Sequence, residues 1–155
     1  MRRATFPGLE RNSGFEPWVL YPEAGAVAAH ARHQPMSGTG RRMHRHLAGK
    51  AVALLGRDSG FLDYPAAGAV AFALGLWDLR QPGASVAVLE RAVRLLALAD
   101  RFAYSRMLPA LSWPFARDVA EERRPGLLDA VRAELAPRSV VDLRDDVLRL
   151  VSGIG

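Results

Sequence analysis

The sequence contains no cysteine, which excludes disulfide bonds, thiolate metal sites and a cysteine nucleophile. It contains a single lysine, Lys50, against twenty arginines, so guanidinium groups carry almost all of the positive charge. Heavy use of arginine, alanine, leucine and glycine suggests a GC-rich genome, and we expect a bacterial source. A chain without cysteine suits a reducing compartment, and we expect the protein to be cytoplasmic.

No apolar run is long enough to span a bilayer, which needs roughly 20 residues. The most apolar run extends from Ala66 to Trp77 and is bounded by Asp63 and Asp78. Its length suits a buried helix. The two arginines at positions 2 and 3 are not followed by an apolar stretch of signal-peptide length. We therefore expect neither membrane insertion nor export.

The sequence also lacks any sustained alternation of apolar and polar residues rich in β-branched side chains, so it predicts no strand. Half of its residues are apolar and 24% are charged, which is ordinary for a globular protein. With 155 residues the chain has the length of one domain with one core, and we expect residues 1–155 to form a single domain.

Part of the chain is a copy of another part. The segment 21–30 matches the segment 64–73, and most positions are identical, including the motif Tyr-Pro at the start of each. Residues 11–15 likewise match 57–61, and residues 50–55 match 91–96. Three matches in the same order at nearly the same offset indicate a repeat of about 43 residues, a period typical of two-helix units.

Local signals agree with two helices in each unit. Pro22 and Pro65 suit a first helical turn, where the missing N–H is not needed. We predict an all-α fold of stacked helical hairpins, with repeat one at about 11–56, repeat two at about 57–106, a degenerate third repeat at about 107–136 and a C-terminal helix at about 139–152. The individual helices are expected to follow Pro22 and Pro65 and to cover about 41–55, 85–101, 113–123, 127–136 and 139–152. Ser85 and Ser139 are the expected N-caps of two of them.

This architecture resembles the α-solenoid class, which includes tetratricopeptide and HEAT repeats, from about residue 11 to residue 136. Leu74-Gly75 and Ala87 fall where a tetratricopeptide pattern has them. Asp78, Arg91 and Arg94 depart from that pattern, because they stand where aromatic or small residues are expected. The resemblance implies a surface that binds another protein and no chemistry of its own.

All four histidines lie within one short segment: His30, His33, His44 and His46. Imidazoles are good ligands for zinc, copper or nickel, so the four are candidates for a metal site. Surrounding arginines disfavour a dication, however, and the alternative is a solvated basic face. We therefore predict no cofactor, and an enzyme or metal protein ranks last among the functional readings.

The same segment is the best candidate for binding nucleic acid. Its cations are Arg32, Arg41, Arg42, Arg45 and Lys50. Residues 1–58 contain nine Lys/Arg and four Asp/Glu, whereas residues 59–155 contain twelve of each, so the whole excess of positive charge lies in the first third. A basic patch is what phosphate binding requires. The segment has no interleaved aromatic residues and no helix-turn-helix signature.

Protein–protein interaction as a scaffold is the preferred function, nucleic-acid association the first alternative, and catalysis or metal binding the second. Trp18, Trp77 and Trp113 are expected in the core between helices, and any that is exposed becomes a candidate contact for a partner protein. The apolar stretch 147–151 near the end of the chain raises self-association as a further expectation.

Overall fold

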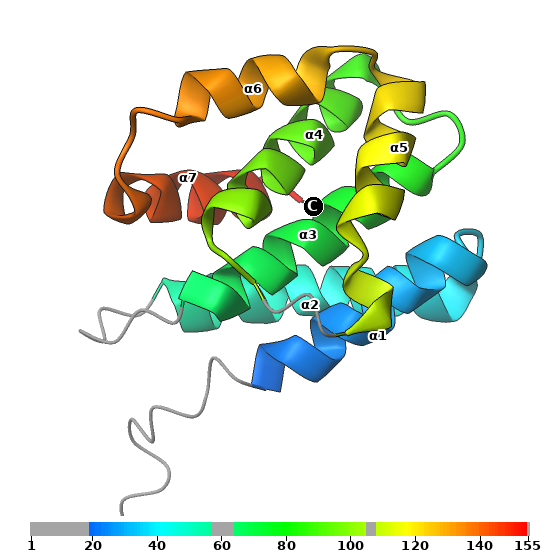
Figure 1. Ribbon diagram of the computed structural model, residues 1–155. Helices are drawn as coiled ribbons and strands as arrows, with labels where there is room; N and C mark the ends of the chain where they lie inside the picture. The colour runs from blue at the N-terminus through cyan, green and yellow to red at the C-terminus, as the bar shows by residue number, and fades with distance from the viewer. Residues whose placement is uncertain (1–18, 57–63, 105–107, 155) are drawn as a thin grey trace, which may run out of the picture.

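A computed structural model describes residues 19–56, 64–104 and 108–154. Within these ranges the protein is all-α, as predicted, and no strand is present. The elements in chain order are α1 (Leu20–His33), α2 (Gly38–Leu55), α3 (Tyr64–Arg80), α4 (Val86–Arg101), the short 3-10 helix η2 (Pro109–Leu111), α5 (Trp113–Arg123), α6 (Leu127–Leu135) and α7 (Val140–Ser152). Figure 1 shows how these helices pack around α3.

Serine side chains cap four of the helices at their N-termini. The predicted cap Ser85 accepts a hydrogen bond from the backbone N–H of Val88, and Ser37 and Ser112 cap α2 and α5 in the same way. Ser139 caps α7 as predicted. Each cap satisfies one of the backbone donors that have no partner within the helix, which fixes where the helix begins.

The capping of α7 differs in one detail from a standard capping box. The Ser139 hydroxyl accepts from the backbone N–H of Asp142 at 3.2 Å and donates to the Asp142 carboxylate at 2.7 Å. In the standard box a Glu or Gln at this position reaches back to the backbone N–H of the cap residue. Aspartate is one methylene shorter, and here it meets the hydroxyl instead.

The two predicted hairpins are α1 with α2 and α3 with α4. Pro22 is the third residue of α1 and Pro65 the second residue of α3, so both lie in a first turn, as expected. The division into repeats at 11–56, 57–106 and 107–136 stays a prediction, because the matching segments 11–15 and 57–61 lie outside the described residues. The pair α5 and α6 occupies the segment expected for the third repeat.

Helix α3 lies at the centre of the molecule, in contact with α1, α2, α4, α5, α7 and η2. Every residue from Ala66 to Leu79 is buried, including Phe72 and Trp77. The apolar run in the sequence is therefore a core helix, as its length predicted. None of the described helices combines the length and apolar character that a bilayer span requires.

Glycines let neighbouring helices approach α3 closely. A Cβ atom added to Gly75 would lie 2.8 Å from the backbone oxygen of Ala92 in α4. In α2, a Cβ added to Gly40 would lie 2.5 Å from the ring of Trp77. Side chains at these positions would force the helices apart, so the small residues of the sequence set the spacing of the core.

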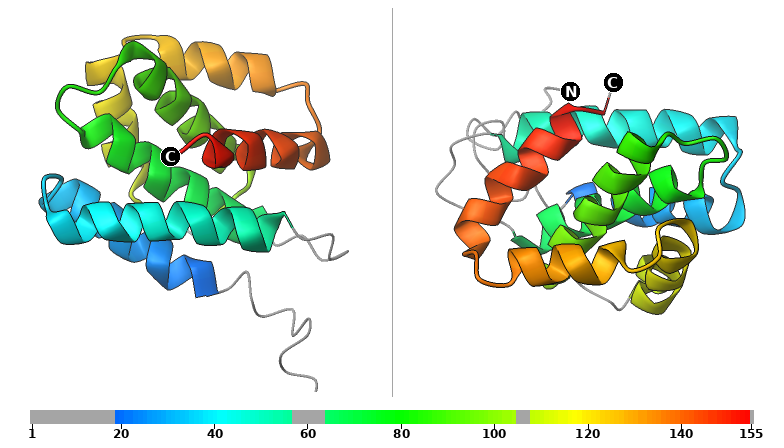
Figure 2. Two further views of the ribbon diagram at one scale, coloured as in Figure 1. Left: turned by 180° about the vertical axis from the view of Figure 1, so that it is seen from behind. Right: turned by 90° about the horizontal axis from the view of Figure 1, so that it is seen from above.

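Helix α7 folds back onto α2, α3 and α4 (Figure 2). Val147 and Val151 are buried in this contact, so the apolar stretch 147–151 contributes to the core and gives no support to self-association. In a solenoid each repeat contacts only its neighbours. The contact between α7 and α2 joins the last described helix to the second one, and the helices surround α3 instead of extending along an open axis.

The close crossing of α3 and α4 predicts opposite effects for two glycine-to-alanine substitutions. Gly75→Ala should destabilise the protein by about 1–3 kcal/mol, since the obstructing atom is a backbone oxygen and a whole helix must move. Gly49 lies on the exposed side of α2 with nothing within 4 Å of an added Cβ. Gly49→Ala should stabilise by up to about 1 kcal/mol through helix propensity. Urea denaturation measures both, and equal stability of the two variants would contradict the close crossing.

Candidate functional site

The structure separates the tryptophans that sequence reasoning grouped together. Trp77 is buried, with 3% of its surface exposed, and has no surface to offer a partner. Trp113, the first residue of α5, is partly exposed at a surface pocket. Trp18 lies outside the described residues. Among the described tryptophans, only Trp113 can contact another molecule.

The Trp113 pocket has a volume of about 330 Å³ and lies where the chain turns from η2 into α5. Its walls are mostly apolar, with one cation, and consist of Arg32, Leu108, Pro109, Leu111, Ser112, Trp113 and Pro114. Leu108 is 38% exposed at this pocket. Two prolines with fixed φ and the Ser112 cap restrict the backbone here, so the pocket has a defined shape before any ligand enters.

Two arginines contact the residues around the Trp113 pocket. Arg32 donates a hydrogen bond to the Pro109 carbonyl at 3.2 Å, and its guanidinium lies 5.0 Å from the centre of the Phe115 ring. On the other side, the guanidinium of Arg132 lies 5.7 Å from the centre of the Trp113 ring. These cation–π contacts connect α1 and α6 to the start of α5.

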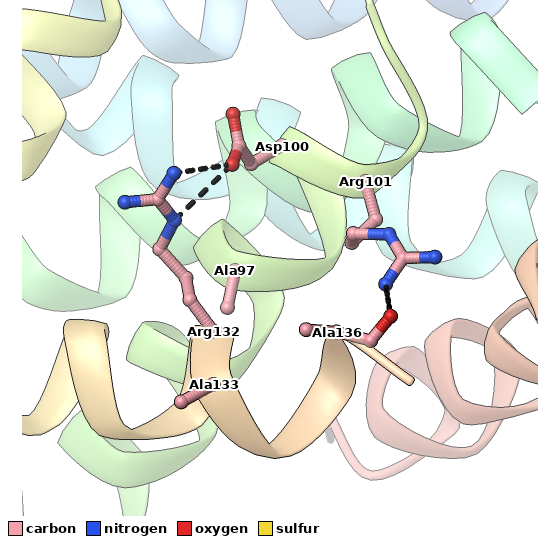
Figure 3. Close-up of a pocket in the computed structure, with 6 residues that line it drawn as sticks. All are labelled: Ala97, Asp100, Arg101, Arg132, Ala133 and Ala136. Atoms are coloured by element: carbon pink, nitrogen blue, oxygen red, sulfur yellow. Dashed lines mark hydrogen bonds and ion pairs between the residues drawn. The ribbon is translucent and has the colours of Figure 1, made fainter. Parts of the chain in front are cut away.

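A second hollow, of about 360 Å³, lies between α4 and α6, and Figure 3 shows the side chains that line it. Ala97, Ala133 and Ala136 form its small apolar surface. Arg132 donates from Nε and Nη2 to Asp100 Oδ2 at 3.2 and 3.0 Å. Arg101 turns away toward the end of α6.

Arg101 caps the C-terminus of α6. It donates to the carbonyl oxygens of Leu135, Ala136 and Arg138 at 2.7, 2.9 and 2.8 Å. Carbonyls at a helix C-terminus have no partner in the helix, and a cation there is favoured by the helix dipole. Because both arginines of this hollow are engaged by the protein, the arrangement holds α6 against α4 and does not present them to a ligand.

The polar side of α4 connects to every later helix. Four pairs join it to α5, α6 and α7: Glu90 with Arg124, Arg94 with Glu134, Asp100 with Arg132, and Arg91 with the carbonyl of Gly153. Nothing in their sequence spacing identified these pairs, whose members lie 32 to 62 residues apart. The structure shows that they bind the C-terminal helices to the central hairpin.

The four histidines do not come together. His44 is buried, whereas His33 and His46 are exposed, and the His30 ring makes a 3.0 Å hydrogen bond with Ser37. No group of three or more His, Asp or Glu side chains in the described ranges is arranged to hold a metal ion. His44 and His46 lie on different sides of α2, as the helical spacing predicted.

His44 belongs to a buried charged cluster that sequence reasoning missed. Its Nε2 atom lies 3.2 Å from Asp78 Oδ1 in α3, and its ring stacks on Trp77 at 5.8 Å between centroids. Arg91 of α4 donates from Nη2 to Asp78 Oδ2 at 3.1 Å. Arg91 also donates from Nη1 to the carbonyl of Gly153, beyond the end of α7. The cluster thus connects α2, α3, α4 and the end of α7.

Asp78 and Arg91 are two of the three residues that depart from the tetratricopeptide pattern, and here these two departures compensate each other. A buried carboxylate needs a charged partner, because transfer from water is costly. Asp78, 5% exposed, ends the apolar run of the sequence. In the sequence, an acid directly after a long apolar run was a signal that the acid needs a charged partner. The separation of 13 residues between Asp78 and Arg91 could not identify that partner.

The cations of the proposed nucleic-acid segment fall into two groups. Arg32 contacts Pro109 and Phe115, and Lys50 forms an ion pair with Glu23 at 2.5 Å. Arg41, Arg42 and Arg45 are exposed on the outer side of α2.

Two carboxylates near α7 have shifted pKa values. Burial raises the pKa of Asp146, but hydrogen bonds from Arg138 and Arg149 lower it by more, so the net pKa lies below the ordinary value. The hydrogen bond from Arg94 lowers the pKa of Glu134. Both carboxylates join elements of the C-terminal part of the chain, and both contacts weaken when the acid is protonated.

We expect the Asp78 cluster to contribute strongly to stability. Asp78→Asn leaves the Arg91 guanidinium without its counter-charge and should cost about 3–5 kcal/mol. Replacing both partners, in Asp78→Leu/Arg91→Leu, should cost less than the single change, since no uncompensated charge remains. The control is Asp118→Asn in the exposed pair with Arg117, which should cost at most about 1 kcal/mol. Urea denaturation measures the free energy of unfolding of each variant. An equal decrease for Asp78→Asn and Asp118→Asn would refute this role.

The lowered pKa of Asp146 predicts a dependence of stability on pH. Its ion pairs stabilise the fold above the unfolded-state pKa, about 4, and this contribution disappears as the pH falls through the lower folded-state pKa. Asp146→Asn should therefore lower the free energy of unfolding by at most about 1 kcal/mol at pH 7, because water screens both arginine partners, and the difference from the unmodified protein should shrink as the pH falls below the unfolded-state pKa. Denaturation at a series of pH values tests this, and a difference independent of pH would be contrary to it.

Comparison with known proteins did not assign the chain to a family. No protein-family model, no curated protein and no solved structure matches it.

Proposed function

We propose that this protein is a non-catalytic protein-binding module built from helical hairpins, and that a partner inserts an apolar side chain into the Trp113 pocket. The observation that carries the proposal is the partly exposed Trp113 beside Leu108 and two prolines in a pocket of about 330 Å³. Tryptophan is enriched among the residues that dominate binding energy at protein interfaces.

The chemistry of the pocket favours a peptide segment as its ligand. Its walls are apolar except for Ser112, which caps α5, and Arg32, which is engaged by the Pro109 carbonyl and Phe115. A leucine or aromatic side chain of the partner would displace water from Leu108 and Trp113 and gain hydrophobic contact. The proposal includes that the helical hairpins are of the tetratricopeptide or HEAT kind. It is supported by the hairpin order of the helices and by the placement of Pro22 and Pro65.

Selection of a displayed peptide library against the purified protein tests this function. We expect selected peptides to carry a large apolar residue and to bind with affinity that depends on the pocket. Leu108→Asp places a charge at the exposed edge of the pocket and should weaken binding at least about tenfold, a change of about 1.4 kcal/mol. Because Leu108 is partly exposed, this variant should fold normally.

The matched control is Val141→Asp, which makes the same kind of change at an exposed residue of α7. It should bind the selected peptides as well as the unmodified protein does. If no peptide is enriched, or if Leu108→Asp and Val141→Asp bind equally, the pocket is not the binding site and the proposal is wrong.

A further inference from the structure

The outer face of α2 carries a concentration of positive charge in its first three turns. Arg41, Arg42 and Arg45 are exposed there together with Gly38, Thr39 and His46, while Gly40, His44 and Leu47 face the core. Every exposed residue of this half of the helix is therefore polar or glycine. Figure 2 shows α2 along the outside of the molecule.

Arg41 and Arg45 differ from the other arginines that the structure describes. In the described ranges, each of the others makes a hydrogen bond, an ion pair or another recorded contact within the protein. Arg41 and Arg45 have no such contact with a described residue. Among the arginines of the described ranges, these two face solvent without a recorded polar contact, one helical turn apart.

This arrangement is unfavourable for the isolated protein. Like charges four residues apart on a helix repel each other, and cations near the start of a helix oppose its dipole. The first turn of α2 contains no acidic residue to compensate. Glu23 of α1 does not compensate this charge either, because it is paired with Lys50. Arg42 donates to the Thr39 hydroxyl, but Arg41 and Arg45 have no recorded polar partner among the described residues.

We propose that the face formed by Arg41, Arg42 and Arg45 binds the phosphate backbone of double-stranded nucleic acid. Guanidinium groups match phosphate oxygens in geometry and charge. Arg41 and Arg45 lie about 6 Å apart along the helix axis, which is comparable to the distance between neighbouring phosphates of one strand. Binding would be independent of base sequence, because phosphate contacts carry no sequence information.

The composition of the face favours a duplex over other polyanions. An acidic protein partner would need an apolar centre to its interface, and a membrane-surface helix would need large apolar side chains to insert. The exposed residues of this half of α2 include no large apolar side chain. Apolar surface on this face comes from the partly buried Met43, which lines a pocket of about 310 Å³ with Glu23, Arg42 and His46 and is too small to form the centre of a protein interface. Single strands bind on exposed aromatic rings, and no Phe, Tyr or Trp lies on this helix.

Fluorescence anisotropy of a labelled 20-base-pair DNA duplex, titrated at several salt concentrations, tests the proposal. The unmodified protein should bind at low salt, and log K should fall linearly with log salt. Arg41→Ala/Arg45→Ala removes two phosphate contacts and should reduce the magnitude of the slope by about 1.8, since each contact contributes about 0.9. The variant should keep its helical circular dichroism and be at least as thermally stable as the unmodified protein, because the change relieves repulsion on the helix and removes no recorded hydrogen bond or ion pair with a described residue.

The control is Arg117→Ala/Arg149→Ala, which removes the same charge from exposed sites on α5 and α7. It should keep the slope of the unmodified protein. If both double variants reduced the slope of log K against log salt equally, net charge alone would attract the duplex, and the proposal would be overturned. No binding at low salt would overturn it too, as would tighter binding to a single strand or to vesicles containing anionic phospholipid. None of these outcomes bears on the Trp113 pocket, so the two proposals fail separately.

Discussion

The burial of α3 on every side is the constraint on which the rest of the structure depends. A helix surrounded by neighbours cannot have a polar side, and small residues such as Gly75 bring those neighbours close. The single carboxylate within its buried stretch, Asp78, must then be neutralised by other helices. His44 and Arg91 meet it from α2 and α4, and Arg91 continues to the end of α7. The position of four elements thus follows from one buried helix and one buried charge.

Local chemistry made the helices predictable from the sequence. Ser85 and Ser139 are caps whose effect extends over one turn, and proline and glycine act through their own backbone angles. Such signals do not depend on the rest of the fold. The apolar run 66–77 likewise indicated a core helix, because its length excluded a bilayer span and its composition excluded a surface position.

Contacts between distant residues could not be predicted in the same way. His44 stood in a segment rich in arginine and looked like part of a basic surface, yet it is buried because Asp78 and Trp77 lie opposite. The return of α7 to α2 has no local signal, since Val147 and Val151 would suit any apolar surface. The Trp113 pocket depends on Arg32, which is far away in the chain. The spacing of apolar residues predicts which side of a helix is apolar, but it does not predict which neighbouring helix covers that side.

The return of α7 also limits how such a chain can grow. Open solenoids change length by gain or loss of whole repeats, because each new unit stacks on the last and disturbs only one neighbour. Here α7 occupies surface on α2, α3 and α4 at once. A further hairpin inserted before α7 would have to compete with it for that surface or displace it. The packing of the described helices thus leaves substitution of outer side chains as an easier route of change than the addition of a hairpin.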